Sequence, residues 1–491
     1  MSDETIFALA SAPGRAGIAV VRISGPATGE TLQRLGCALP TPRRATRAQL
    51  FDPTTKELLD DGLVLWFPGP HSFTGEDVAE LHLHGGRAVI ASVLEALSHL
   101  DRTRLAEPGE FTRRAFAHDK LDLTQAEALA DVIDAETRAQ AKQALRQMGG
   151  ALKELYDDWR HRLVQALAHL EAVIDFPDED LPPDVANKVW PEVRDLAQAI
   201  RAHLDDDRRG ERVRAGVRIV IVGPPNAGKS SLLNWLARRD AAIVSDRPGT
   251  TRDVIEVHLD VGGFAVTVVD TAGLRTSADD IEVEGVRRAQ KQAANADIKI
   301  VLFDGAVYPA RDSETMALID DNALVAVNKA DLLADPLTRS APPRDLSPLG
   351  RGVHASSGAD KPPSPLRGEV RRNASKGEGD LLRSMDAART ASGAQFISVV
   401  DGTGMDAFMA KLETMIRARM DGGTSAPLTR ARHRRGLEEC VAALERAAQA
   451  TLPELASEDL RVAARALGRL TGRVEVDEIL DVVFRDFCIG K

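Results

Sequence analysis

Apolar and polar positions follow a strand-like pattern near the N-terminus. The runs TIFALAS, IAVVRIS, LVLWF and VAELHLHGG are rich in β-branched and large apolar residues, which predicts strands. AVIASVLEALSHL has apolar residues at helical spacing. We therefore expect an α+β domain over residues 1–119.

Two later regions follow a helical pattern instead. Ala, Leu, Glu and Arg recur at three- and four-residue spacing over 120–213, where the acidic, proline-containing stretch 173–183 interrupts them, and again over 421–491. Thr124 and Glu127 have the spacing of a capping box, so a helix should begin near Thr124. We expect one all-helical domain, discontinuous in sequence, with residues 214–420 inserted into it.

The inserted segment opens on a strand, a glycine-rich loop and a helix. Val217–Val222 is a mostly apolar run, typical of a buried strand, and an apolar helical pattern follows from Ser231. The loop between them fits GxxxxGK[ST], from Gly223 to Ser230. In such a loop the backbone N–H groups face phosphate oxygens, Lys229 reaches the β- and γ-phosphates, and Ser230 can bind Mg²⁺.

Three more motifs complete a nucleotide site. DTAG at 270–273 follows the run FAVTVV, so that Asp270 can hold Mg²⁺ through water and Gly273 can donate to the γ-phosphate. NKAD at 328–331 ends in Asp331, which can accept hydrogen bonds from N1–H and the 2-amino group of guanine and so selects GTP over ATP. GTTRD at 249–253 supplies Thr251 for Mg²⁺. Together the motifs predict a Ras-like P-loop GTPase domain.

The catalytic part differs from Ras. Leu274 occupies the position of the water-orienting Gln, and no arginine finger can be assigned among Arg247, Arg252 and Arg275. The amide oxygen of Asn226 could hold a monovalent cation near the β/γ bridge. Alternatively, Asn226 simply forms the turn.

Composition narrows the class of protein. The 491 residues carry a formal net charge of −11, which argues against a generally basic nucleic-acid binder but leaves local basic patches open. The only cysteines, Cys37, Cys440 and Cys488, do not form a disulfide framework. No signal peptide or membrane-spanning run is recognisable, and the ending FCIGK is a poor prenylation box. We expect a cytoplasmic protein.

Two further features allow alternatives. Residues 336–394 hold clustered Pro, Ser and Gly and few large apolar groups, which predicts a disordered insertion; Arg371 and Arg372 would instead suit an RNA-binding tail. Glu80, His82 and His84 share one strand face, and such residues could hold a metal or line a small-molecule pocket.

The motifs and their flanks resemble the MnmE (TrmE) family of tRNA-modification GTPases, which is related to the Era and EngA GTPases. The resemblance runs through TIFALASAPG, VVRISGP, ELHLHGG, PGEFTRRAF, KLDLTQAEA, GPPNAGKSSLLN, DTAGLR and FCIGK. It implies a homodimer whose N-terminal domain binds 5-formyl- or 5,10-methylene-tetrahydrofolate, and a heterotetramer with the FAD protein MnmG. It further implies potassium-dependent GTP hydrolysis coupled to adding a carboxymethylaminomethyl or aminomethyl group at C5 of the wobble uridine of tRNA.

The resemblance also implies individual roles. Glu282 corresponds to the residue that positions the attacking water, and Cys488 to a terminal cysteine without an assigned role. The implied magnesium ligands are Ser230 and Thr251, and the potassium ligands are Asn226, Ser245, Arg247 and Thr250. The implied folate contacts are Arg22, Glu80, Lys120 and Lys491. The implied GTP site comprises Asn226, Ala227, Gly228, Lys229, Ser230, Ser231, Ser245, Asp246, Arg247, Pro248, Gly249, Thr250, Thr251, Asp270, Thr271, Ala272, Gly273, Asn328, Lys329, Asp331 and Ser398.

The guanine side departs from the family pattern, because Val399 and Val400 follow Ser398 in place of Ala and a polar residue. A competing function is a regulatory or ribosome-assembly GTPase that acts only as a binding switch. A folate pocket and the FCIGK ending favour the modification enzyme, because a pure switch needs neither.

Overall fold

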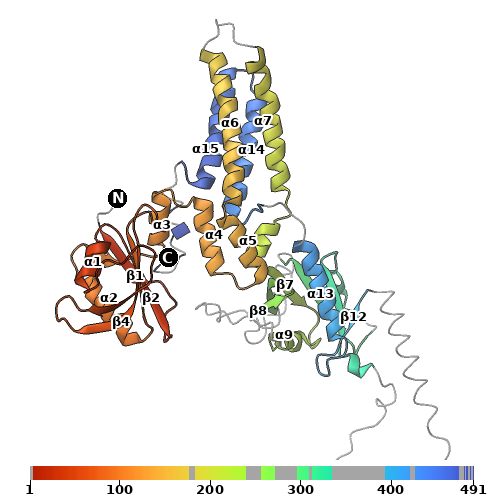
Figure 1. Cartoon of the computed structure of the whole chain (residues 1–491). Coiled ribbons are helices and arrows are strands. Elements are labelled where there is room, and N and C mark those ends of the chain that lie inside the picture. The colour runs from red at the N-terminus through yellow and green to blue at the C-terminus, as the bar shows by residue number, and fades with distance from the viewer. Residues whose placement is uncertain are drawn as a thin grey trace, which may run out of the picture. The chain divides into compact units, whose positions relative to one another are not determined.

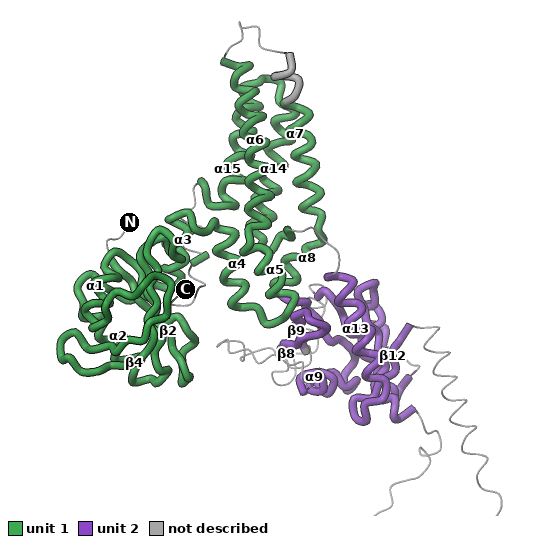
Figure 2. The backbone as a smooth tube through the Cα atoms, viewed as in Figure 1, with its two compact units in different colours: residues 1–214, 422–491 green, residues 215–421 purple. Residues whose placement is uncertain are grey.

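The chain forms two compact units in a computed structural model. Residues 1–214 and 422–491 make up unit 1, and residues 215–421 make up unit 2 (Figure 2). The structure describes residues 4–175, 183–238, 256–270, 296–308, 312–333, 393–420, 426–474, 480, 483, 484, 487 and 490, without the side chains of 183–188 and 270.

Unit 1 begins with a six-stranded sheet in the order β3-β4-β5-β2-β1-β6. Its strands are β1 (Thr5–Leu9), β2 (Ile18–Ser24), β3 (Thr46–Phe51), β4 (Leu58–Phe67), β5 (Val78–His84) and β6 (Thr103–Leu105). All neighbours are antiparallel except β1 and β6. The helices of this part are α1 (Thr28–Arg34), α2 (Arg87–Ser98) and α3 (Glu110–Ala117). The expected strands are confirmed, whereas α1, β3 and β6 have no clear sequence pattern.

The alternation along each strand puts two apolar clusters on opposite faces of this sheet. Phe7, Val21 and Leu81 are fully buried in the cluster that includes α2. Ile6 and Ala8 point the other way and pack with Phe111 of α3. The same alternation brings Glu80, His82 and His84 to one face of β5, where each is less buried than its neighbours.

The helices of unit 1 come from both ends of the chain. They are α4 (Leu123–Ile133), α5 (Arg138–Met148), α6 (Ala151–Asp175), α7 (Pro183–Leu204), α8 (Arg209–Ala215), α14 (Ala431–Gln449) and α15 (Pro453–Thr471). Figure 1 shows α6, α7, α14 and α15 side by side, and one apolar core joins them. Leu163 of α6 and Leu444 of α14 are both fully buried there, although 281 positions separate them.

The expected capping box at the start of α4 is wrong in its residues. Asp122 is the N-cap, its side chain accepts from the Gln125 N–H, and Gln125 reaches back to the Asp122 N–H. Thr124 and Glu127 are both buried within the helix. Glu127 makes ion pairs with arginines of α14 instead, because its position one turn into the helix faces α14 and not the helix end.

Unit 2 is a six-stranded sheet in the order β12-β11-β10-β7-β9-β8. Its strands are β7 (Val217–Val222), β8 (Glu256–Val261), β9 (Phe264–Asp270), β10 (Ile298–Asp304), β11 (Ala323–Asn328) and β12 (Gln395–Phe396). Only the β8–β9 pair is antiparallel. Its described helices are α9 (Lys229–Ala237), α11 (Ser313–Met316), η2 (Ala330–Leu332) and α13 (Met405–Met420). The carboxyl ends of the parallel strands therefore carry the predicted motifs, as expected for a ligand site in this class of sheet.

The predicted insertion lies outside the described residues, apart from its last two. Ala394 is fully buried in the core of unit 2, so it belongs to the approach to β12 and not to an insertion. Within the described ranges, every helix is too short or too polar to serve as a membrane span.

Candidate nucleotide and small-molecule sites

The loop after β7 is held by two close approaches of the backbone. Gly228 has φ +93°, and a Cβ on it would lie 2.2 Å from Nδ2 of Asn328. At Gly223 a Cβ would lie 2.2 Å from the Leu302 carbonyl oxygen. Both positions therefore require glycine, which explains the two glycines of the motif without reference to any ligand. α9 begins at Lys229, two residues earlier than the apolar pattern predicts.

Lys229 lies over this loop. Its Nζ donates to the carbonyl oxygens of Gly223 and Pro224, each at 2.9 Å. Ala227 is buried, whereas Ser230 and Ser231 are exposed in the first turn of α9. The helix N-terminus, the ammonium group and the two hydroxyls thus meet at one place, and this arrangement suits the phosphates of a nucleotide.

Asn226 is exposed and adopts φ +64°. Asn is among the few side chains that accept this left-handed conformation readily, so its role in the turn is real. An exposed amide at this point also remains available to a ligand. Both interpretations of Asn226 are therefore compatible with the loop.

Asn328 joins three loops. Its Nδ2 donates to the Ala227 carbonyl at 2.9 Å, and its Oδ1 accepts from the Val399 N–H at 3.3 Å. The side chain is 3% exposed. The first residue of NKAD is thus a link between the phosphate loop and the loop after β12.

Two further residues of NKAD, Lys329 and Asp331, differ in their contacts. Lys329 has φ +62°, and its Nζ pairs with Oδ2 of Asp304 at 2.7 Å. Oδ1 of Asp331 is buried and has no hydrogen-bond partner among the described residues. A buried carboxylate oxygen without a donor is costly, and the donors of a guanine edge would satisfy it.

The loop after β12 contributes through its backbone. Ser398 is fully buried, and its Oγ accepts from the Asp401 N–H at 3.4 Å. Val399 makes its contact to Asn328 with its N–H, which any residue except proline could supply. The departure at Val399 therefore does not disturb the contact that this loop makes.

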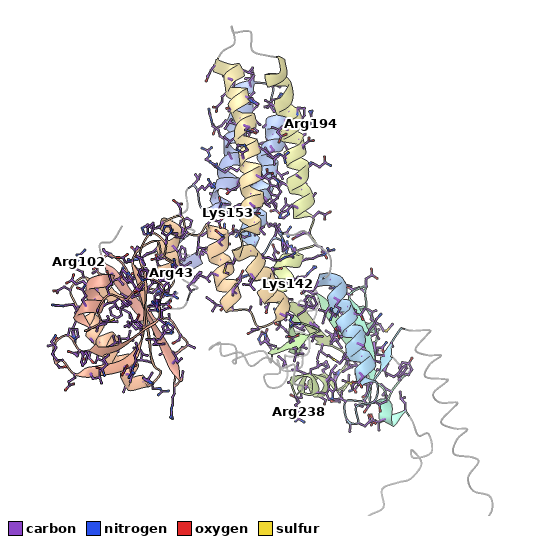
Figure 3. The ribbon with its side chains drawn as sticks, in the orientation of Figure 1. Arg43, Arg102, Lys142, Lys153, Arg194 and Arg238 are labelled. Carbon is purple, nitrogen blue, oxygen red and sulfur yellow. The ribbon has the colours of Figure 1, made fainter. Side chains whose placement is uncertain are left out.

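A second site lies on the N-terminal sheet. A cavity of about 310 Å³ is lined by polar and aromatic side chains, among them Arg22, Arg43, Phe73 and Glu80; Figure 3 labels Arg43. Arg22 of β2 donates to Oε1 of Glu80 on β5 at 2.9 and 3.1 Å. Its guanidinium carbon lies 5.5 Å from the Phe73 ring centre and 5.8 Å from that of Phe111. The cavity offers a cation, a carboxylate and aromatic faces to a flat, polar ligand.

The other oxygen of Glu80 lies 3.5 Å from Nε2 of His82. This nitrogen is buried and lacks a hydrogen-bond partner among the described residues. Lys120 is exposed beside Gly75, and the described lining of the cavity does not include it. The structure thus brings Arg22 and Glu80 together and leaves Lys120 outside their cavity.

The metal alternative for Glu80, His82 and His84 has no support. His84 Nδ1 lies 2.8 Å from Oδ1 of Asp60, while Glu80 pairs with Arg22. The described part of the chain holds no group of three His, Cys, Asp or Glu side chains placed to bind a metal.

Comparison with known proteins agrees with this organisation. The sequence profile described as "GTP-binding protein TrmE N-terminus" matches residues 5–120, and the one described as "MnmE helical domain" matches residues 123–488. The tRNA modification GTPase MnmE of Paramagnetospirillum magneticum is 52% identical over 490 residues, covering 100% of both chains. The chain belongs to the MnmE family of tRNA modification GTPases.

Other relatives carry related names. The tRNA modification GTPase MnmE of Rhodospirillum rubrum is 51% identical over 503 residues and covers 100% of both chains. The mitochondrial 5-taurinomethyluridine-[tRNA] synthase subunit GTPB3 of Danio rerio is 44% identical, covering 100% of this chain and 93% of its own. Among solved structures, an Era variant of Aquifex aeolicus bound to GDP.AlF4- is 18% identical, with a TM-score of 0.26 over 48% of this chain and 69% of its own. We infer the P-loop fold from the sheet and the loops described above, and not from this likeness.

Several residues expected from the MnmE family lie outside the described residues. These are Ser245, Asp246, Arg247, Pro248, Gly249, Thr250, Thr251, the side chain of Asp270, Thr271, Ala272, Gly273, Glu282, Cys488 and Lys491. The structure adds Asp304 and the backbone contact of Val399 with Asn328, neither of which sequence reasoning predicted. An acidic residue at the end of the apolar run IKIVLFD was the available signal for Asp304, and a backbone contact such as that of Val399 leaves no signal at all.

Proposed function

We propose that this MnmE-family chain hydrolyses GTP in the modification of tRNA at C5 of the wobble uridine. The full-length likeness to tRNA modification GTPases supports the reaction class. The observation that carries the nucleotide assignment is the buried Oδ1 of Asp331, which has no hydrogen-bond partner within the described ranges and fits the donors of guanine.

The described residues have clear tasks in this proposal. Asn328 links the phosphate loop to the loop after β12. The residues that would bind the phosphates and those that would bind the base are therefore held together. Lys229, whose ammonium group donates to the carbonyl oxygens of Gly223 and Pro224, supplies positive charge to the phosphates. Ser230 and Thr251 would hold Mg²⁺, which neutralises phosphate charge when it is bound.

Hydrolysis then needs a partner for the charge that develops at the β/γ bridge. Leu274 cannot supply it, and we assign this task to K⁺ held by Asn226, Ser245, Arg247 and Thr250, with Glu282 positioning the water. Asn226→Gly tests the cation ligand, because glycine accepts the left-handed backbone and removes only the amide. The variant should bind GDP normally and lose most of the difference between KCl and NaCl in turnover.

The cavity at Arg22 and Glu80 is the proposed site for 5-formyl- or 5,10-methylene-tetrahydrofolate. Glu80 can accept from the donors of the pterin edge, Arg22 can pair with carboxylate, and Phe73 offers a flat face. Lys120 and Lys491 are proposed as additional contacts. Titration with 5-formyl-tetrahydrofolate should lose its heat in Arg22→Ala and keep it in the control Arg47→Ala, which breaks an arginine–carboxylate pair of the same sheet at a more exposed position, that of Arg47 with Asp61.

The proposed roles of the domains and the proposed partners follow from membership of the MnmE family. Residues 1–119 would dimerise and bind folate, 120–213 with 421–491 form the helical domain, and 214–420 form the GTPase domain. We propose a cytoplasmic homodimer that joins the FAD protein MnmG in a heterotetramer and acts on tRNA. No membrane partner is proposed.

The deciding experiment measures the modified nucleoside. A bacterial strain lacking its own relative of this protein should regain the C5-modified wobble uridine, detected by mass spectrometry of tRNA nucleosides, when it carries this chain. A strain that regains growth but not the nucleoside would favour a regulatory GTPase that acts only as a binding switch.

A further inference from the structure

One carboxylate in unit 1 is shared by two arginines that lie far apart in the sequence. Oδ1 of Asp131, near the end of α4, accepts from Nε of Arg214 at 2.8 Å and from Nη2 of Arg430 at 2.8 Å. The Asp131 side chain is 11% exposed. Hydrogen bonds between ionised partners at this distance are among the stronger polar contacts in proteins, and partial burial limits their screening.

The two arginines stand at the two connections to unit 2. Arg214 is the last residue before the chain enters unit 2 at Ala215. The chain returns to unit 1 at Gly422, and Arg430 is the N-cap residue of α14. Asp131 therefore holds Arg214, which adjoins the entry, and Arg430, which lies eight positions after the exit, at the same atom of α4.

Neighbouring contacts keep both connections close to α5. Gln140 donates to the Arg214 carbonyl at 3.1 Å, and Gln143 donates to the Gly210 carbonyl at 2.9 Å. Figure 3 labels Lys142 on this helix. On the exit side, Thr429 donates to Oε1 of Gln147 at 2.9 Å.

The entry and the exit also touch one another. A Cβ on Gly210 of α8 would lie 2.1 Å from the Leu428 carbonyl oxygen. No larger residue fits at Gly210 unless the exit segment moves. The two connecting segments are thus joined in two ways. Asp131 binds an arginine of each segment, and Gly210 allows the backbones of the two segments to lie in contact.

We propose that Asp131 is a positioning residue that couples the GTPase unit to the helical domain. An inserted unit on two independent tethers can move without disturbing its host. Here neither tether can shift alone without breaking a charged hydrogen bond, so a displacement caused by the nucleotide state is passed to α4 and α14. This inference rests on the proposed function, since coupling requires that GTP hydrolysis drives tRNA modification.

The variant Asp131→Asn tests the proposal in the full-length protein, because it removes the charge and keeps the shape. Potassium-stimulated GTP turnover and GTP affinity should stay within about threefold of the wild type, whereas the C5-modified wobble uridine in a complemented strain should fall at least about tenfold, which is within the usual range of coupling between sites. Hydrogen exchange of the α8 amides and of residues 426–430 should rise.

The matched control is Asp157→Asn. Asp157 of α6 also accepts from two cations, Lys153 at 2.8 Å and Arg473 at 2.9 Å, but neither of these partners adjoins a connection to unit 2. It should leave turnover and modification unchanged. A second variant, Arg214→Gln with Arg430→Gln, removes the same two hydrogen bonds to Asp131, together with the contact of Arg430 with Glu127. It should lose at least as much modification as Asp131→Asn, and adding Asp131→Asn to it should cause no further loss.

Equal modification by wild type and Asp131→Asn would overturn the coupling role. So would a parallel loss of hydrolysis and modification with a lowered melting temperature, which is the result of a purely structural defect. Should Asp131→Asn fail to fold, the double arginine variant decides by the same two measurements. A wild type that produces no C5-modified uridine contradicts the proposed function instead, and the two failures are therefore distinguishable.

Discussion

At the residue scale, the phosphate loop depends on a position that has no side chain. Gly228 combines a left-handed φ with a contact that a Cβ would make at 2.2 Å to Asn328 Nδ2. Gly228→Ala must therefore push away the residue that links the loop to the guanine side. We expect GTP affinity to fall at least about tenfold, beyond the ~1–2 kcal/mol of backbone strain that the conformation alone costs.

The variant Gly263→Ala separates the effect of backbone strain from the effect of a steric clash. Gly263 has φ +90°, close to that of Gly228, but nothing lies within 4 Å of its Cβ position. Its alanine variant should lose stability by a similar strain and bind GTP as the wild type does in a fluorescent-nucleotide titration. Equal losses of affinity in both variants would mean that the contact with Asn328 is unimportant.

The carboxylate of Asp331 makes a second prediction at this scale. In Asp331→Asn, an amide N–H would face the 2-amino group of guanine, so two charge-assisted hydrogen bonds of about 1.5–3 kcal/mol each are lost. GTP affinity should fall at least about a hundredfold. Xanthosine triphosphate, which carries an oxygen at that position, should bind the variant better than GTP does.

The control for this change is Asp320→Asn. Asp320 is a half-exposed carboxylate of the same unit and pairs with Lys299 at 2.6 Å. Its variant should keep both the affinity and the preference for GTP. If Asp331→Asn showed the same nucleotide preference as this control, the guanine assignment would be wrong.

At the scale of elements, α4 and α14 are joined through a buried histidine and a buried glutamate. His433 Nε2 lies 2.9 Å from Oε2 of Glu127, and Arg432 pairs with the same carboxylate. Burial opposes ionisation of Glu127, but Arg432 and His433 outweigh it, so the pKa of Glu127 lies well below its usual range. Burial first, and then Arg432, lowers the pKa of His433. The imidazole is therefore neutral and donates from Nε2, while its buried Nδ1 has no partner among the described residues.

This arrangement predicts loss of stability in mild acid. The folded pKa of His433 lies below its ordinary value of 6.5, so the unfolded chain takes up the proton first as the pH falls. The stabilisation is complete above that value and decreases below it, by up to about 1.4 kcal/mol at a pH about one unit lower. Urea unfolding at about pH 7.5 and about pH 5.5 measures the difference.

His433→Gln isolates the contribution of this residue, because its amide can still donate to Glu127. The variant should show a smaller difference in unfolding free energy between the two pH values. Some dependence should remain, since burial also lowers the pKa of His203. An unchanged pH dependence would mean that the pKa of His433 is the same in the folded and the unfolded chain, which would contradict this prediction.

At the scale of the whole molecule, none of the described residues of unit 2 belongs to the core of the helical domain. Its described members come from 152–200 and 426–470. Replacing residues 216–424 with a flexible linker of about eight residues, which spans about 26 Å at full extension, should therefore leave a folded unit 1. Gly210 already lies against Leu428, so the linker bridges a short gap.

Circular dichroism should show a helical protein that unfolds cooperatively. Truncation after residue 425 is the informative comparison, because it removes α14 and α15 and exposes Leu163 and Ile200. That variant should lose cooperative unfolding. A disordered linker variant would mean that unit 1 needs the inserted unit to fold.

Sequence reasoning succeeded where a structure is built from neighbouring residues. The strand Val217–Val222, the glycines after it and the helix from Lys229 occupy one continuous stretch, so their spacing reflects local backbone geometry directly. The same holds for NKAD at the end of β11. The strands of the N-terminal sheet were predictable because alternation is a local property, whereas the three-residue β6 is too short to show it.

The sequence alone determined the class of the nucleotide site, the helical flanks and the resemblance to the family, because these depend on motifs and periodicity. Only the tertiary structure decided the roles of Glu127, Asp131 and Asp304. A carboxylate one turn into a helix looks the same in sequence whether it caps that helix or pairs with an arginine 305 positions away. Partners that far apart leave no local pattern, and the packing of α4 against α14 selects between them.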